Sequence, residues 1–292
     1  MADKVNTIDE IGVAEFNRQY FCHELTSLYD DVITRVFPYK FAFQSELKDV
    51  ELPVCSNIGS YAFYHCEKLS NISLPGLSST YSNFGTSAFA YTGVTTIDFL
   101  PKSITTIPAG MFAGCSNLTG RIVLSSYINY VQPNAFAYTG IEEICAYAKS
   151  IYSAFKACGN LRNVELPNLV SLASNTFSEC YSLENVSAPL LESISDYAFA
   201  NCSKLAKVSF PACRYIGYSV FYNCTDLSTI YVRQDSCNLG TSNAFLSTKI
   251  TFATGSIYVP ASRVDYYRNS TNWNWFSTQI KGYDYENDRP VD

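Results

Sequence analysis

A phenylalanine that returns about every 22 residues is the most regular feature of the hydrophobic pattern. A fixed period of this length indicates a solenoid, in which each repeat is one supersecondary unit stacked on its neighbours. The sequence therefore predicts a repeat solenoid of about ten repeats, with its function on a surface and not in a single pocket. The periodic positions are Phe43, Phe63, Phe89, Phe112, Phe136, Phe155, Phe177, Phe199, Phe221 and Phe245.

Each repeat also contains a short run of alternating apolar and polar residues, clearest in LRNVELP, LENVSAP and LAKVSFP. In the first copy, Val164 and Leu166 flank Glu165, which is the period of a strand with one buried face. Proline then ends the strand, because it has no amide proton to donate. A second apolar position lies five residues before the phenylalanine, and we expect it to close the coil from the other side. One coil cannot bury both apolar edges alone, so the strands are expected to form a parallel ladder spaced ~4.8 Å apart.

Cysteine follows the phenylalanine by three residues in six repeats, and threonine takes this position in three others. Where threonine stands, the next apolar residue comes one position sooner, so we expect a structural corner with buried, free thiols. Disulfides are not expected, because the parallel Cβ vectors of stacked cysteines hold their sulfur atoms apart. A metal ladder is not expected either, since no CxxC pair occurs. Cys145 differs because it takes an outward strand position, where we expect an exposed, reactive thiol whose redox state the sequence leaves open. The corner residues are Cys66, Cys115, Cys158, Cys180, Cys202, Cys224, Thr92, Thr139 and Thr248.

The repeat pattern IGxxAFxxCxxLxxVxLP, present as NIGSYAFYHCEKLSNISLP and YIGYSVFYNCTDLSTIYV, resembles the BspA-like leucine-rich repeats over about residues 33–280. The ending SIYVPASRVDYYRNSTNWNWFSTQI is similar to the closing segment common after such repeats. The resemblance implies a right-handed leucine-rich-repeat coil, with a parallel β-sheet on one face and a cap at both ends. It also implies a non-catalytic recognition module, as in bacterial surface adhesins and phage-encoded proteins, with no shared catalytic residues.

Four segments are predicted along the chain. Residues 1–32 carry Phe21, Leu25, Leu28 and Val32 at helical spacing, which predicts a helical cap or an attachment segment. The solenoid takes residues 33–252 and a C-terminal cap takes residues 253–280, where Val264, Tyr267, Trp275 and Phe276 are expected to cover the last coil. Residues 281–292 are polar and expected to be mobile.

Composition and charge exclude several classes of function. The net charge is −6 and lysine and arginine do not cluster, which argues against nucleic acid as a partner. No apolar run is long enough for membrane insertion. Two histidines and the absence of a catalytic motif argue against an enzyme, a metal site or a cofactor. The N-terminus lacks the features of a secretory signal, so we expect an extracellular or cell-surface protein if a signal was removed, and otherwise a virion component released by lysis.

The outward-facing strand residues are the candidate binding site. They are Glu51, Ser73, Asp98, Val123, Cys145, Glu165, Ser187, Ser209 and Tyr231, a row without lysine or arginine. A solenoid presents such a row as a continuous platform suited to an extended ligand. The hypothesis is that Glu51, Ser73, Asp98, Glu165, Ser187, Ser209 and Tyr231 bind a protein or glycan on a cell surface, with Tyr231 as an aromatic anchor. The alternative is an ordinary solvated sheet face.

Two function classes therefore stay open. The chain is a recognition or adhesion protein, either on a bacterial surface or as a tail or fibre component of a phage virion that recognises its host. Alternatively, it is a structural virion or assembly protein whose solenoid acts as a rigid spacer and binds neighbouring virion proteins. The sequence leaves the ligand and homo-oligomerisation open.

Overall fold

The computed structural model describes residues 25–77 and 83–291, and the chain forms two compact units. The N-terminal unit contains the described residues up to 104 together with 108–118. The C-terminal unit contains residues 105–107 and the chain from 119 onward.

The N-terminal unit is built on two ladders of parallel strands. In the first, Leu28, Val50 and Ile72 occupy equivalent positions on successive strands. The first ladder consists of β1 (Ser27–Tyr29), β3 (Asp49–Glu51) and β5 (Asn71–Ser73), and η1 (Pro75–Leu77) follows it. The second ladder consists of β2 (Arg35–Val36), β4 (Asn57–Ile58) and β6 (Asn83–Phe84).

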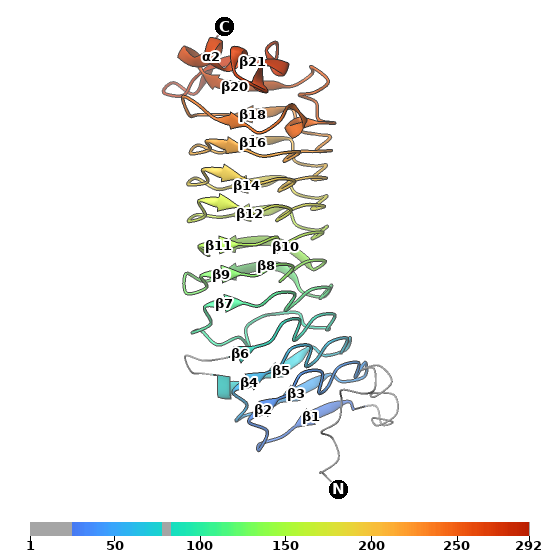
Figure 1. The fold of residues 1–292 in the computed structure, drawn as a ribbon. Helices are drawn as coiled ribbons and strands as arrows, with labels where there is room; N and C mark the ends of the chain where they lie inside the picture. The colour runs from blue at the N-terminus through green and yellow to red at the C-terminus, as the bar shows by residue number, and fades with distance from the viewer. Residues whose placement is uncertain (1–24, 78–82, 292) are drawn as a thin grey trace. The chain divides into compact units, whose positions relative to one another are not determined.

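The C-terminal unit repeats this arrangement, and Figure 1 shows its strands stacked one above another from β8 to β20. One hydrogen-bonded sheet joins β8 (Thr119–Leu124), β10 (Gly140–Ala146), β12 (Asn163–Glu165) and β14 (Asn185–Ser187). A second sheet joins β16 (Lys207–Ser209), β18 (Thr229–Tyr231), β20 (Ser256–Pro260), β21 (Ile280–Asp284) and β22 (Arg289–Val291).

Strands of two residues form the other side of the C-terminal unit. They are β7 (Thr106–Ile107), β9 (Tyr130–Val131) and β11 (Ser150–Ile151) in one sheet, and β13 (Ser171–Leu172), β15 (Ser193–Ile194), β17 (Tyr215–Ile216) and β19 (Asn238–Leu239) in another. The predicted parallel ladder is therefore confirmed. The apolar position that was expected only to close the coil forms a second parallel ladder of its own.

A column of stacked phenylalanine rings fills the core of each unit. In the C-terminal unit, for example, the ring centre of Phe177 lies 5.6 Å from that of Phe155 and 5.7 Å from that of Phe199. The predicted column is correct except at its start, where Phe41 stacks on Phe63 at 5.5 Å while Phe43 is 41% exposed. Phe41 precedes Phe63 by one full repeat, whereas Phe43 is two residues out of phase.

The corner cysteines donate hydrogen bonds to the preceding coil. Cys180 Sγ donates a hydrogen bond to the carbonyl oxygen of Phe155, at 3.3 Å, one coil earlier. In a threonine corner, Thr139 Oγ1 donates to the Phe136 carbonyl of its own coil at 2.8 Å, and Cys158 Sγ donates to the same oxygen at 3.1 Å. The predicted structural corner is confirmed, and the ten described cysteines are all free and buried. Cys22 lies outside the described residues.

Cys145 is one of these buried thiols, with 4% of its surface exposed, so the prediction of an exposed, reactive side chain is wrong. Its strand, β10, lies between β8 and β12. Arg121 on β8 and Glu165 on β12 form an ion pair with 3.6 Å between Nη2 and Oε2. These long side chains therefore meet across β10, where they cover Cys145. The alternation of residues along a strand does not reveal cover by side chains of neighbouring strands.

Two residues in most coils adopt the left-handed backbone conformation, two positions before and two after the phenylalanine. Around Phe177 these are Asn175, with φ 58°, and Glu179, with φ 65°. The later position holds the same conformation in every coil, at Phe43, His65, Tyr91, Gly114, Tyr138, Ala157, Glu179, Asn201, Asn223 and Ser247. Each coil therefore makes its sharp corners on either side of its core phenylalanine.

The C-terminal cap contains η3 (Ala261–Arg263), α2 (Val264–Asn269) and η4 (Trp273–Phe276), and η2 (Ser242–Phe245) precedes it in the last coil. Tyr267, Trp273 and Phe276 are buried there, and the Trp273 and Phe276 rings lie 6.1 and 5.3 Å from Phe245. Of the other two residues predicted to cover the last coil, Val264 is half-buried, but Trp275 is 74% exposed. A 3₁₀ turn has three residues per turn, so residues 273 and 276 share one side and residue 275 faces away.

Both predicted end segments differ from expectation. Residues 1–24, which include most of the expected N-terminal helix, lie outside the described residues; where the helix was expected to continue, Ser27–Tyr29 form β1 and pair with β3. Leu28 fits the apolar position of this strand ladder as well as it would fit the apolar face of a helix.

The C-terminal tail, which was expected to be mobile, forms a hairpin instead. β22 pairs antiparallel with β21, and Tyr285 Oη donates to the carbonyl of Tyr258 at 2.9 Å. No helix within the described ranges is long and apolar enough to cross a membrane.

Candidate ligand-binding groove

An open groove of about 990 Å³ lies over the outward face of β10, β12, β14 and β16 in the C-terminal unit. It lies where the sheet is interrupted, because β14 ends one hydrogen-bonded ladder and β16 begins the next. The neighbouring edges of these two strands therefore lack the ladder that joins the other strands of their sheets. Three of the residues that line it come from the predicted row, namely Glu165, Ser187 and Ser209.

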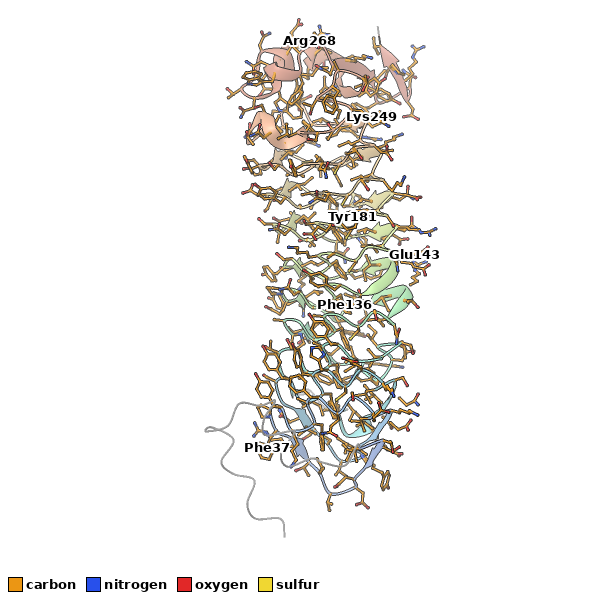
Figure 2. All side chains as sticks on the ribbon, turned by 90° about the vertical axis from the view of Figure 1, so that its right-hand side faces the viewer. Phe37, Phe136, Glu143, Tyr181, Lys249 and Arg268 are labelled. Atoms are coloured by element: carbon orange, nitrogen blue, oxygen red, sulfur yellow. The ribbon has the colours of Figure 1, made fainter. Side chains whose placement is uncertain are left out.

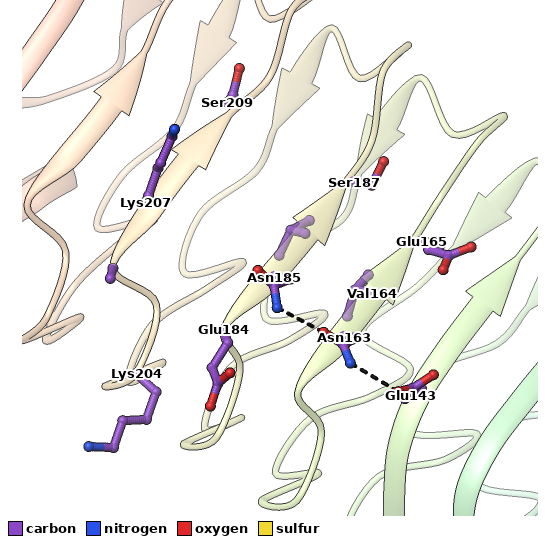
Figure 3. Close-up of a pocket in the computed structure, with 12 residues that line it drawn as sticks. Glu143, Asn163, Val164, Glu165, Glu184, Asn185, Ser187, Lys204, Lys207 and Ser209 are labelled. Atoms are coloured by element: carbon purple, nitrogen blue, oxygen red, sulfur yellow. Dashed lines mark hydrogen bonds between the residues drawn. The ribbon is translucent and has the colours of Figure 1, made fainter.

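A ladder of side-chain hydrogen bonds runs along one edge of the groove, as Figure 3 shows. Asn185 Nδ2 donates to Asn163 Oδ1 at 2.9 Å, and Asn163 Nδ2 donates to Glu143 Oε1 at 3.0 Å. Lys207 takes the equivalent place on β16, but its Nζ lies 4.7 Å from the centre of the Tyr231 ring. The ladder therefore holds two amide groups in fixed orientation and ends at Asn185.

Charges of both signs line the groove. Glu143 lies on β10 and Glu165 on β12, Glu184 directly precedes β14, and Lys204 and Lys207 belong to the coil of β16. Glu143 lies at the outer edge of the unit, as Figure 2 shows, and is half-buried. These groups are solvated and the Arg121–Glu165 pair is about half-exposed, so such pairs contribute little to stability. Their charge stays accessible to a ligand.

The predicted site residues are not all brought together. Tyr231 lies on β18 next to the groove, and its ring stacks on Tyr258 at 5.1 Å. Glu51 and Ser73 are exposed on β3 and β5 of the N-terminal unit. Asp98 is exposed in a turn, so its predicted strand position is wrong; its backbone N–H donates to Thr96 Oγ1 at 3.2 Å.

The row of binding residues predicted from the sequence did not include the second outward-facing position of each strand. Glu143, Asn163, Asn185 and Lys207 lie two residues before the predicted row and share its face, because side chains alternate along a strand. The signal was present in the repeats, where NV, NV and KV precede the predicted residue.

A similar polar ladder exists in the N-terminal unit. Asp49 accepts hydrogen bonds from Asn71 Nδ2 at 2.7 Å and from Ser27 Oγ at 3.1 Å. These bonds favour the charged carboxylate and lower the pKa of Asp49, with Asn71 as the larger cause. Polar ladders at this strand position are thus a feature of both units.

Metal chemistry has no site among the residues that the structure describes, since they form no group of three or more histidine, cysteine or carboxylate side chains suited to a metal ion. His65, the one histidine within the described ranges, stacks between Phe43 and Tyr91 with ring-centre distances of 5.6 and 4.5 Å. His23 lies outside those ranges.

Comparisons with known proteins show which family the repeats belong to. Seven solved chains match; among them are a leucine-rich repeat protein from Bacteroides ovatus (22% identity, 90% of this chain and 85% of that one, TM-score 0.41) and a leucine-rich cell surface protein from Faecalibacterium prausnitzii (17% identity, 88% and 91%, TM-score 0.39). A leucine-rich repeat protein from Eubacterium ventriosum is also similar (16% identity, 82% and 87%, TM-score 0.44). No curated protein matches. The family model for the BspA type leucine rich repeat region matches residues 34–152 and 149–272 in six copies. Since these matches take in most of the chain and agree with its stacked parallel coils, the chain belongs to the BspA type leucine-rich repeat family.

Proposed function

We propose that this protein is a non-catalytic recognition or adhesion module that binds a cell-surface protein or glycan through the groove over β10–β16. The observation that supports this most is the groove itself. It is a hollow of about 990 Å³ lined by charged and amide side chains on a stacked sheet face. Packed parallel coils hold these groups in place before a ligand arrives, which lowers the entropic cost of binding.

The setting of this activity is also part of the proposal. The resemblance to repeat-containing adhesins favours a bacterial surface, and a virion that touches its host is the alternative setting for the same groove. In either setting the ligand is a surface group outside the cell that makes the protein.

The test is the binding of labelled protein to intact bacteria and to animal cells, compared with a Glu165→Lys/Tyr231→Ala variant. The first change reverses a charge inside the groove, and the second removes the ring beside Lys207. We expect at least tenfold weaker binding by the variant, with an unchanged circular dichroism spectrum. Glu192→Lys is the matched control, because Glu192 is exposed in the same unit but does not line the groove.

Unchanged affinity of the double variant for a surface that the native protein binds would remove this groove from consideration. Absence of binding to every cell type at micromolar protein would instead favour the rigid spacer that contacts neighbouring virion proteins or other copies of itself.

A further inference from the structure

We infer that the ligand of the groove over β10–β16 is a neutral, extended glycan that lies across the strands, an inference that rests on the proposed function. The first support is the chemistry of the lining. Protein–protein interfaces are enriched at their centre in aromatic residues, methionine and arginine, and depleted in lysine, glutamate, serine and alanine. The twelve residues that line this groove are of the depleted kinds, together with asparagine and two valines.

The second support is the hydrogen-bonding capacity that the amide ladder leaves unused. A side-chain amide offers two N–H donors and two acceptor lone pairs. Asn163 gives one donor to Glu143 and one acceptor to Asn185, so one of each remains. Asn185 gives only one donor, so its oxygen is open to a ligand. A sugar hydroxyl donates and accepts at once and matches both residues.

The third support is the mixture of charges. Carboxylates such as Glu165 and Glu184 only accept hydrogen bonds, and Lys207 only donates them. Hydroxyl groups satisfy both kinds, and hydrogen bonds to charged groups are stronger than those between neutral groups. A polyanionic ligand would instead meet the three carboxylates of the groove, so the sign pattern favours a neutral chain.

The fourth support is spacing. The ladder repeats once per coil, at a strand separation of ~4.8 Å, whereas an extended peptide advances only ~3.4 Å per residue. A peptide laid across the strands would therefore fall out of register with successive rungs. The sheet face also offers side chains and not the backbone groups that a peptide needs for a strand ladder. A β-linked sugar unit in an extended chain is close in length to one rung and keeps its register.

The experiment is a microarray of immobilised oligosaccharides that includes neutral β-linked hexose and N-acetylhexosamine chains beside sialylated and uronate-containing ones. We expect the native protein to bind neutral chains, and Asn163→Ala/Asn185→Ala to bind at least tenfold more weakly. Lys207→Gln, which leaves the ladder intact, is expected to weaken the same binding to a smaller extent. Ser193→Ala is the matched control, because it removes a 2.8 Å rung to Ser171 on the other ladder of the same unit.

Cells that bind the protein supply the second arm, after either periodate oxidation of their glycans or protease treatment. Loss of binding after periodate, together with neutral hits on the array that the asparagine variant loses, supports the inference. Binding only to anionic chains, or neutral hits unaffected by the asparagine changes, overturns it. Cell binding that resists periodate, is abolished by protease and still depends on Glu165 also overturns it, while the proposed function stands. Absence of binding to cells and array alike overturns both.

Discussion

At the residue scale, the left-handed corner positions are the least expected feature of the coils. A residue other than glycine in this conformation costs roughly 1–2 kcal/mol, yet tyrosine, asparagine and serine fill most of these positions. Contacts between coils offset part of the cost. The rings of His65 and Tyr91 stack at 4.5 Å, and Asn223 Nδ2 donates to Asn201 Oδ1 at 2.9 Å. Where Gly114 takes the position, with φ 73°, a Cβ atom would lie 2.3 Å from the Tyr91 ring, so a larger residue there would require that ring to move.

Ala157 has the same conformation, with φ 58°, but its methyl group makes neither a ring contact nor a hydrogen bond. Ala157→Gly should therefore raise the free energy of unfolding by about 0.5–1 kcal/mol, because relief of the left-handed strain exceeds the entropy that glycine loses on folding. Urea denaturation measures this. Ala154→Gly is the control: Ala154 is fully buried with ordinary backbone angles and should lose stability. A loss of stability at both positions would show that residue 157 is not strained.

These corners could not be predicted from the sequence, for a physical reason. Glycine normally reports a left-handed backbone, but here successive coils use side chains as different as those of Tyr138, Ala157 and Glu179. The conformation is imposed by closure of the coil and not by the residue. The buried phenylalanines were predictable because only one residue type fills that site, and the single error, Phe43 for Phe41, arose where two phenylalanines compete.

At the element scale, each coil is fixed to the one before it by backbone ladders, ring stacking and the corner thiol. The exchange of cysteine for threonine shows how closely these contacts are coupled. A threonine hydroxyl satisfies its own coil's phenylalanine carbonyl, as Thr92 does for Phe89 at 2.8 Å, and Cys115 of the next coil then shares that oxygen at 3.1 Å. The sequence showed that residue and loop length change together, but which coil each side chain reaches needed the structure.

Loss of one ring from the phenylalanine column should weaken both neighbouring coils. Phe177→Ala is expected to lower the free energy of unfolding by about 3–5 kcal/mol, since it removes a fully buried ring from between Phe155 and Phe199. Phe43→Ala, at the exposed position, should cost about 1 kcal/mol, the value of its ring contacts. Guanidinium denaturation distinguishes the two, and equal losses would contradict the placement of Phe43 outside the column.

The groove was predictable in part at this scale. Strand alternation correctly brought Glu165, Ser187 and Ser209 to one face, and the same rule applied two residues earlier would have found Asn163 and Asn185. The break between β14 and β16 was not predictable, because NVS and KVS show the same alternation on its two sides. A missing ladder depends on how neighbouring coils turn and leaves no residue pattern.

At the scale of the whole molecule, the repeat is continuous in sequence while the fold divides into two units near residues 105–118. The coil before this division has no strand at Asp98, and its Phe99 packs on Phe89 and Phe112 at 5.1 and 6.2 Å inside the N-terminal unit. The buried corner thiols are common to both units. The stability of both units at high pH should therefore depend on the ionisation of these thiols.

Burial raises the pKa of Cys66 to about 12 and the pKa values of Cys115 and Cys158 to about 11, because a thiolate is poorly solvated inside a coil. In the unfolded chain these thiols ionise near their ordinary value of 9.0. A raised folded pKa means that this contribution to stability is fully present below pH 9 and is lost as the pH rises through 11 to 12. The free energy of unfolding should thus be nearly constant from pH 7 to 8 and fall above pH 9, by about 1.4 kcal/mol per pH unit for each thiol. Urea denaturation along a pH series measures this slope, and Cys158→Ser, which keeps a small hydrogen-bonding group, should reduce it by the share of one thiol. A slope unchanged by that substitution would mean that the Cys158 thiol ionises as readily in the folded coil as in the unfolded chain.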